Sequence, residues 1–319
     1  MTRRFVSQLN VGENIDQIFL VRSVRELKTR ADKRYLDVEL SDRSGTIAAK
    51  IWDGVDKVLG AFQVDDYVKV RGQVTEYKGQ LQITVSSISK AKDEGINEAE
   101  MLPHTEKDPA EMLGRLKEVL TTGVTEPNLR RLISLFLDDP GFMATFKRSS
   151  AATTFHHAYI GGLLEHTVSM LNMALRILPE YPALDKNLLL AAVFLHDIGK
   201  TVEMSGTRGF YFTDEGKMLG HVYMGAEMIE TRARTLAGFP HQLLNLLKHM
   251  VLSHHGTLEW GSPVLPCTME AIALHYLDNL DAKMNAFVIE TNRIRDPERR
   301  WSDWSRMFER ELYRGAVKE

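Results

Sequence analysis

The apolar residues of this chain change their spacing between residues 90 and 109, and this change constrains the fold more than any other feature. Before it, runs rich in β-branched and aromatic residues alternate between apolar and polar side chains, which is typical of strands. After it, apolar residues recur every three or four positions, as they do on one face of a helix. Because 319 residues suffice for two domains, we predict a β domain followed by a helical domain.

The order of elements in the first 90 residues narrows the β domain to one fold. Its five strand-like runs are separated by turn signals such as SDRSGT and YKGQ, and a helix-like segment, WDGVDKVLGAF, follows the third run. Five strands with a short helix after the third is the order of a five-stranded Greek-key barrel, the OB-fold. The runs are IDQIFLVRSVREL, RYLDVELSD, GTIAAKIWD, DYVKVRGQVTEY and GQLQITVSSISKA.

The remaining segments set the predicted domain boundaries. Polar residues 91–108 are expected to link the barrel, residues 1–90, to a helical domain that spans 109–319. The first helix has a clear start, because Asp108 is a candidate N-cap and a proline follows it. Residues 295–319 alternate aromatic and charged side chains, as in an amphipathic helix that packs on a domain or on a second subunit. The predicted fold class is multidomain, α and β: an N-terminal OB-fold barrel plus a C-terminal all-α domain.

Composition excludes several classes of protein. The one cysteine, Cys267, allows no intrachain disulfide and favours a reducing cytoplasm. The longest apolar runs are shorter than the roughly 20 residues that span a bilayer, and the N-terminus lacks a signal-peptide stretch, so we expect no membrane partner. Residues 1–90 contain 15 Lys and Arg against 12 Asp and Glu, whereas the rest contains 25 against 31. This balance permits a nucleic-acid surface on the barrel without requiring one.

Ionisable residues lie on helix faces that should point into the core. The run from Leu188 to Leu195 has no polar side chain and leads directly to His196 and Asp197. A buried carboxylate must be paired or must bind a metal, because leaving it unpaired costs several kcal/mol. Other ionisable residues share apolar stripes at spacings of three or four, and these are His166, His221, His254, His255 and Asp278.

The number of these residues favours a metal centre over separate core positions. One histidine on an apolar face is more often a core residue that bonds to the backbone. Five histidines and two aspartates on four or five helices would be hard to satisfy one by one, whereas a shared metal centre satisfies all of them. Imidazole and carboxylate ligands suit Mn, Fe, Co, Ni or Zn, and the absence of cysteine ligands disfavours a closed structural zinc site.

The order of these residues resembles that of the HD-domain metal-dependent phosphohydrolases. The matching motifs, within about residues 145–290, are LEHT, LHDIGK, GH, SHHG and YLDNLDA. In that family the first histidine, the HD pair and the last aspartate hold one ion, and by position these are His166, His196, Asp197 and Asp278. The additional histidines resemble those of dinuclear members, which implies that Asp197 bridges two ions and that the second set includes His221, His254 and His255.

An OB-fold followed by HHAYIGGLLEHTVSM and this HD core resembles, over nearly the whole chain, the YhaM-type 3′→5′ exoribonucleases of bacteria. This resemblance implies Mn²⁺-dependent release of 5′-mononucleotides from the 3′ end of single-stranded RNA, with single-stranded DNA as a further substrate. It also implies that His156 or His157 reaches the substrate phosphate or sugar. Self-association is left open.

Two other functions compete with this one. The HD site could hydrolyse a small nucleotide while the OB-fold only regulates the enzyme or assembles it. The chain could also be a non-catalytic RNA-binding protein with a structural metal, although the intact ligand set argues against this. HD sites accept mononucleotides, cyclic nucleotides and polymers, so the OB-fold is the only feature that favours a polymer.

Several residues are candidates for catalysis and for substrate binding. Lys200 should face the same way as His196 and Asp197 on a helix and place a cation on a phosphate oxygen, unless it is an ordinary helix-end charge. Asp197 and Lys200 are thus the catalytic candidates, and Asp281 could support a ligand or form a salt bridge. Basic residues that could bind the strand or simply be solvated are Lys147, Arg148, Arg30, Lys33 and Arg34, the last three within 25–34, where the first hairpin loop is expected. Aromatic candidates for base stacking, with barrel core as the alternative, are Tyr35, Trp52, Tyr67 and Tyr77.

Overall fold

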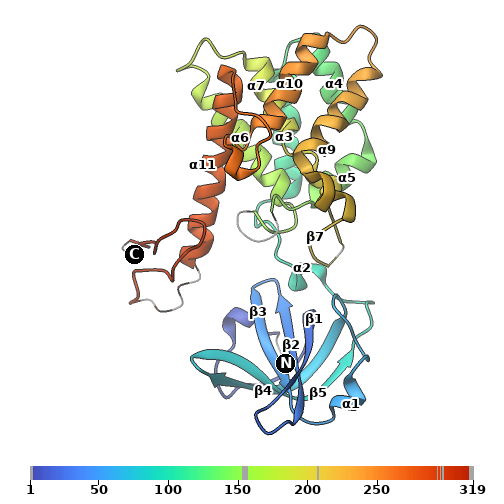
Figure 1. Cartoon of the computed structure of the whole chain (residues 1–319), viewed down its shortest axis with the longest axis vertical. Coiled ribbons are helices and arrows are strands. Elements are labelled where there is room, and N and C mark those ends of the chain that lie inside the picture. Colours follow the sequence, from blue (N-terminus) through green and yellow to red (C-terminus); the bar gives the residue numbers. More distant parts are fainter. Residues whose placement is uncertain are drawn as a thin grey trace. The chain divides into compact units, whose positions relative to one another are not determined.

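The protein consists of two compact units (Figure 1). The computed structural model describes residues 3–152, 157–206, 208–292, 294, 296 and 298–315. One unit comprises Met1–His104 with Thr207–Gly209, and the other comprises Thr105–Gly206 with Phe210–Glu319. The predicted fold class is confirmed, since the first unit is a five-stranded barrel and the second consists mainly of helices. None of the helices in the described residues is both long and apolar enough to cross a membrane.

The first unit is a closed barrel with the strand order β1-β2-β3-β5-β4. All neighbouring strands are antiparallel except β3 and β5, which pair in parallel. The short helix α1 (Val55–Val58) follows β3, as the sequence predicts. Inward side chains such as Phe19, Val38 and Ile83 are fully buried and form the barrel core. The strands are β1 (Asn14–Lys28), β2 (Arg34–Asp42), β3 (Gly45–Ile51), β4 (Tyr67–Tyr77) and β5 (Gln80–Lys90).

The segment expected to be a linker is partly ordered. Helix α2 (Glu98–Met101) begins where the Asn97 side chain accepts a hydrogen bond from the next turn. The side chains of Met101 and Leu102 are each only 2% exposed, so this part of 91–108 packs on the barrel unit instead of remaining free. Two apolar residues in an otherwise charged stretch gave too weak a signal for this to be predicted.

The second unit is built around α7 (Lys186–Leu195). This helix packs against α3, α4, α6, α10 and α11, and all of its residues from Leu188 to Leu195 are at most 4% exposed. Burial on every side explains why the run contains no polar residue. The other helices are α3 (Pro109–Gly123), α4 (Pro127–Leu137), α5 (Pro140–Arg148), α6 (Gly162–Ile177), α8 (Lys200–Glu203), α9 (Asp214–Arg234), α10 (His241–Ser253) and α11 (Met269–Asn292). The strands β6 (Met204–Ser205) and β7 (Tyr211–Phe212) form the hairpin, and a short 3-10 helix, η2, spans Leu258–Trp260.

The C-terminal tail differs from its prediction. Instead of an amphipathic helix, the described residues 298–315 contain no helix, and the chain folds back through isolated bridges, one of them between Trp301 and Tyr313. The centroids of these two rings lie 5.1 Å apart. In a helix, twelve residues would separate them by about 18 Å, so the contact between the rings favours the folded-back loop.

Candidate metal centre

The C-terminal end of α7 delivers an imidazole and a carboxylate into the interior of the helical unit. His196 is the C-cap residue of α7, and Asp197 follows it directly. Their exposed fractions are 0% and 2%. Since α7 is packed on all sides, it holds these two residues at a fixed position between α6, α10 and α11.

The two oxygens of Asp197 face two separate sets of nitrogen atoms. Its Oδ2 lies 3.3 Å from Nε2 of His196 and 3.9 Å from Nε2 of His166. Its Oδ1 lies 3.5 Å from Nε2 of both His221 and His254. This arrangement suits a carboxylate that bridges two ions, each of which would also bind imidazole nitrogens.

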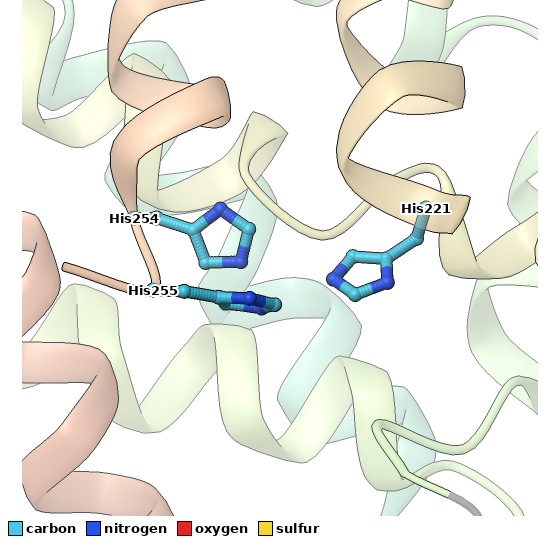
Figure 2. A group of neighbouring side chains, drawn as sticks. All are labelled: His221, His254 and His255. Carbon is cyan, nitrogen blue, oxygen red and sulfur yellow. The ribbon is translucent and has the colours of Figure 1, made fainter. Parts of the chain in front are cut away.

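Further groups complete each set. On the side of His166, Oδ1 of Asp278 lies 3.3 Å from the ring Nε2. On the other side, ligand atoms of His221, His254 and His255 lie within 4.8 Å of one another. Figure 2 shows the ring of His221, from α9, directed toward the two rings at the end of α10. The structure therefore brings together all seven predicted metal ligands.

Hydrogen bonds fix the orientation of the five imidazoles. The Nδ1 partners are Val193 O for His196 (2.9 Å), Val251 O for His254 (2.6 Å), Trp260 O for His255 (2.8 Å), Glu203 Oε1 for His221 (3.0 Å) and Asp281 Oδ2 for His166 (2.7 Å). A carbonyl oxygen can only accept, so Nδ1 of His196, His254 and His255 must donate the proton. Their Nε2 atoms then keep a lone pair for a metal, as is usual for ligating histidines.

Two buried polar atoms support a metal at this position. Oδ1 of Asp197 and Nε2 of His221 are shielded from solvent and lack a hydrogen-bond partner among the described residues. Buried polar atoms are rarely left in this state. Both atoms face each other across 3.5 Å, where a shared cation would satisfy them.

The electrostatics of the first set favour a cation. Burial disfavours the charged form of His166, but hydrogen bonds to Asp278 and Asp281 outweigh burial and raise the pKa of this histidine to about 9. Burial also disfavours the carboxylate of Asp197, yet the charge of Lys200 above all keeps its pKa well below the usual range. The carboxylate of Asp197 is thus ionised, and without an ion His166 carries a proton that a bound metal would have to displace.

Two rings of the second set, those of His254 and His255, are held neutral. Burial lowers the pKa of His254. Burial, reinforced by the charges of His254 and His221, lowers the pKa of His255 to about 3. A neutral imidazole is the form that binds a metal, so these rings are in the ligating form at neutral pH.

A second layer of hydrogen bonds supports His166. The carboxylate of Asp281, which accepts from His166, also accepts from the hydroxyl of Ser169 and lies 2.9 Å from Nε2 of His157. The other ring nitrogen of His157 lies 2.8 Å from the hydroxyl of Tyr159. Of the two roles open to Asp281, support of a ligand is the one that these contacts favour.

The structure places His157 differently from the sequence prediction. Its side chain is 2% exposed, because Asp281 and Tyr159 hold it behind His166, and it does not line the pocket described below. His156 lies outside the described residues. Lys147 and Arg148 occupy the last turn of α5 and do not line that pocket either.

Lys200 lies beside the first set and is not one of its ligands. Its Nζ lies 2.5 Å from Oδ2 of Asp197, and the residue lines a pocket beside the metal centre. The preceding Gly199 makes this arrangement possible, because a Cβ there would lie 2.0 Å from the carbonyl oxygen of His221. A glycine at this corner allows α9 to bring His221 within reach of Asp197.

The barrel residues do not form a comparable cluster. Tyr35, on β2, and Trp52, directly after the end of β3, stack on each other with centroids 4.6 Å apart, and both are half-buried. Lys33 pairs with Asp53, and Arg34 pairs with Glu26 and Asp56. Arg30 is exposed on the hairpin loop.

Two predictions for the barrel need correction. The first hairpin loop does not span 25–34, because β1 continues to Lys28 through its pairing with β2. Tyr67 is only 2% exposed, so it belongs to the interior and cannot stack on a base, whereas Tyr77 is 61% exposed.

Sequence reasoning missed Glu203 and Trp260. Glu203 accepts hydrogen bonds from both the backbone N–H and the Nδ1 of His221, and Trp260 supplies the carbonyl that orients His255. Glu203 is three residues after Lys200, on the turn that follows the HD pair, and this spacing was the available signal. No sequence signal marked the carbonyl of Trp260.

Comparison with known proteins identifies two domains. Residues 163–283 match the family model of the HD domain, and residues 20–91 match that of an OB-fold nucleic acid binding domain. A replication protein A heterotrimer bound to single-stranded DNA is similar at 16% identity over 28% of this chain and 65% of that chain, with a TM-score of 0.22. The second OB-fold domain of replication protein A from Methanococcus maripaludis is similar at 18% identity over 30% and 98%, also with a TM-score of 0.22.

The chain thus carries an OB-fold nucleic acid binding domain followed by an HD domain. An HD domain indicates a metal-dependent phosphohydrolase, and the His and Asp clusters of this unit are groups that could bind metal ions.

Proposed function

We propose that this protein is a metal-dependent 3′→5′ exoribonuclease that releases 5′-mononucleotides from single-stranded RNA, with single-stranded DNA as a further substrate. The single observation that carries the proposal is the division of Asp197 between two nitrogen sets, which suits a pair of ions and hence phosphodiester hydrolysis. The covalent connection of this site to an OB-fold domain supports a polymeric substrate.

The residues of the first set would hold one ion and those of the second set the other, with Asp197 shared. Manganese fits the mixture of imidazole and carboxylate ligands, as do Fe, Co, Ni and Zn. When bound, two divalent ions supply charge that stabilises both the attacking and the leaving oxygen.

Hydrolysis of the terminal phosphodiester has a simple atom balance. The oxygen of water joins the phosphorus, the bond from phosphorus to the 3′ oxygen of the preceding nucleotide breaks, and that oxygen takes up a proton. Lys200 places an ammonium group beside Asp197, where it can stabilise negative charge on a phosphate oxygen. Asp197 holds this ammonium in place and would also share in holding the ions.

The barrel would hold the single strand upstream of the cleaved nucleotide. The stacked pair of Tyr35 and Trp52 offers a half-exposed aromatic surface, and Arg30 is an exposed cation on the hairpin loop beside it. Steep loss of RNA affinity with added salt would support contacts to phosphates.

Labelled substrates test the proposal directly. The purified full chain is incubated with 3′-labelled and 5′-labelled RNA, with and without Mn²⁺, beside DNA of the same sequence and a panel of small nucleotides. We expect a ladder that shortens from the 3′ end only when metal is present. Inert RNA beside rapid hydrolysis of a small nucleotide would refute the proposal and favour the phosphodiesterase alternative.

Self-association is a further part of the proposal. On α11, the exposed positions between Ile272 and Val288 are all apolar and follow one another at a spacing of four. These residues are Ile272, Tyr276, Leu280, Met284 and Val288. An uncharged row of this kind can pack against the same row of a second copy, since rows at this spacing interdigitate. Sedimentation of the wild-type chain and of Leu280→Glu measures this, and a monomeric wild-type chain would refute it.

A cytoplasmic location is also proposed, on the ground that the chain has a single cysteine.

A further inference from the structure

A pocket in the helical unit extends from the candidate metal centre to residues that have no role in the proposed hydrolysis. Its volume is about 360 Å³, and at one end it is lined by Lys200, His221, His255 and Asp278. This volume lies near the lower end of the range of roughly 300–1,000 Å³ that is usual for sites of small ligands. The space therefore suits one nucleotide unit rather than a folded polymer.

The rest of the pocket is more apolar than a site that binds only phosphate would be. Its wall includes the side chains of Trp260, Phe212 and Met307, which are apolar. Trp260 is 53% exposed and Phe212 is 42% exposed, although both lie beside a cluster of charged groups. A site that only had to bind phosphate would be lined by cations and N–H groups, so these exposed aromatic rings call for a planar apolar ligand.

The position of Trp260 relative to the ligands is fixed. It ends the 3-10 helix η2, and its carbonyl oxygen accepts the hydrogen bond from Nδ1 of His255 at 2.8 Å. Helix α11 also lines this pocket. It contributes Asp278, a candidate ligand, together with Asn279 and Lys283. The indole is thus held within one nucleotide's reach of the metal centre.

Polar groups that could read the edge of a base accompany the indole. The Nζ of Lys283 lies 5.9 Å from the centroid of the Trp260 ring and donates to the carbonyl of Met307 at 3.2 Å. The amide of Asn279 can donate and accept. Because amide and ammonium groups are few and the aromatic surface is large, stacking rather than edge recognition would dominate, and the pocket would accept every base.

We propose that Trp260 forms the floor of a nucleobase subsite, on which the base of the 3′-terminal nucleotide stacks while its phosphate lies at the metal centre. This inference rests on the proposed function, because it takes the substrate to be a nucleotide. It adds a recognition element to the helical unit itself, so the terminal nucleotide is held independently of the barrel.

The subsite can be tested by binding alone, with a product nucleotide and with an analogue that lacks the base. The Mn²⁺-loaded full chain is titrated calorimetrically with 5′-AMP and with ribose 5-phosphate, for the wild type, Trp260→Ala, Trp260→Phe and Trp304→Ala. Trp304, which is 66% exposed and does not line the pocket, is the matched control. Metal content is measured for each variant, so that a disturbed His255 is detected.

We expect the wild type to bind 5′-AMP roughly 5- to 150-fold more tightly than ribose 5-phosphate, since stacking on one base is worth about 1–3 kcal/mol. Trp260→Ala should bind both ligands equally weakly, and both Trp260→Phe and Trp304→Ala should keep most of the preference. The proposal is overturned if Trp260→Ala keeps the preference for the base, or if the wild type has none.

Two measurements on the wild-type chain separate this subsite from the proposed function. If the wild type binds 5′-AMP through its base but leaves RNA intact, the exoribonuclease proposal fails and the subsite stands. If it shortens RNA equally fast with a normal and an abasic 3′-terminal nucleotide, the subsite fails and the exoribonuclease proposal stands.

Discussion

The ionisable side chains of the helical unit's metal centre are buried, whereas the candidate basic side chains of the barrel lie at the surface. In the helical unit, seven histidines and aspartates from five segments converge on one buried centre, and two of their polar atoms lack a hydrogen-bond partner among the residues that the structure describes. On the barrel, basic residues such as Lys33 and Arg34 lie at the surface and pair with neighbouring carboxylates. A buried unpaired group must have a function that compensates its cost, whereas a surface pair is worth little and needs none.

Sequence patterns are more informative for the helical unit than for the barrel surface. A polar residue on an apolar helix face is easy to recognise in a sequence, because its apolar neighbours already predict that it is buried. A basic residue in a hairpin is inconspicuous, since solvated lysines and arginines occur on most surfaces. If function is concentrated in the buried centre and only assisted by the barrel, substitutions in the centre should have larger effects than substitutions on the barrel.

The largest effect is expected from Asp197→Ala. This change removes the group between the two ligand sets and leaves the buried ammonium of Lys200 without its partner, so metal binding and hydrolysis should both be abolished. Metal analysis and RNA hydrolysis measure the effect, and Asp214→Ala, an exposed residue of α9, is the control. Retained hydrolysis in Asp197→Ala would show that the buried centre is not the site of catalysis.

A smaller but still large effect is expected from Lys200→Met. If the ammonium stabilises the developing charge on phosphate, turnover should fall by about 10²–10³-fold, as for the loss of one oxyanion donor, while the metal content stays the same. The exposed Lys217 offers a matched control through Lys217→Met. Loss of metal without a separate defect in turnover would assign Lys200 a structural role.

Gly199→Ala should disturb the second ligand set through packing. The new Cβ would meet the carbonyl oxygen of His221 at 2.0 Å, which should destabilise the fold by about 1–3 kcal/mol and displace this ligand. Gly114→Ala is the control, because nothing lies within 4 Å of its Cβ position in α3. Urea unfolding measures both, and equal stabilities would show that the corner can relax.

The smallest effect is expected on the barrel. Trp52→Ala should weaken binding of single-stranded RNA by about 1–3 kcal/mol for one lost stacking contact and leave the hydrolysis of a dinucleotide unchanged. Trp301→Ala, an exposed tryptophan outside the barrel, is the control. Fluorescence anisotropy measures the affinity, and a larger loss of turnover than of affinity would contradict an auxiliary role for the barrel.

Much of the fold could be predicted because local patterns determine it. The alternation of side chains defined the strands, and the apolar run before His196 required a buried helix. The tail could not be predicted in this way, since the contact between Trp301 and Tyr313 joins residues that are distant in the sequence. Nor could the ordering of Met101 and Leu102, which depends on the barrel surface beneath them.

The site likewise has residues that the sequence could predict and residues that it could not. The metal-ligand candidates stand out as polar residues on apolar faces, but their supports do not. Glu203 and Trp260 orient His221 and His255 only because the folded chain brings them close. The burial of His157 behind Asp281 is likewise a tertiary effect, whereas its sequence neighbours suggested a loop.

The ligand geometry around Asp197 predicts a centre that holds two ions. Mass-spectrometric metal analysis of the chain reconstituted with Mn²⁺ and freed of excess metal tests it most directly, in the wild type and in His254→Ala. We predict two ions per chain in the wild type and one in His254→Ala, because this change removes a ligand from only one set. One ion per chain in the wild type, unchanged in His254→Ala, would contradict the account.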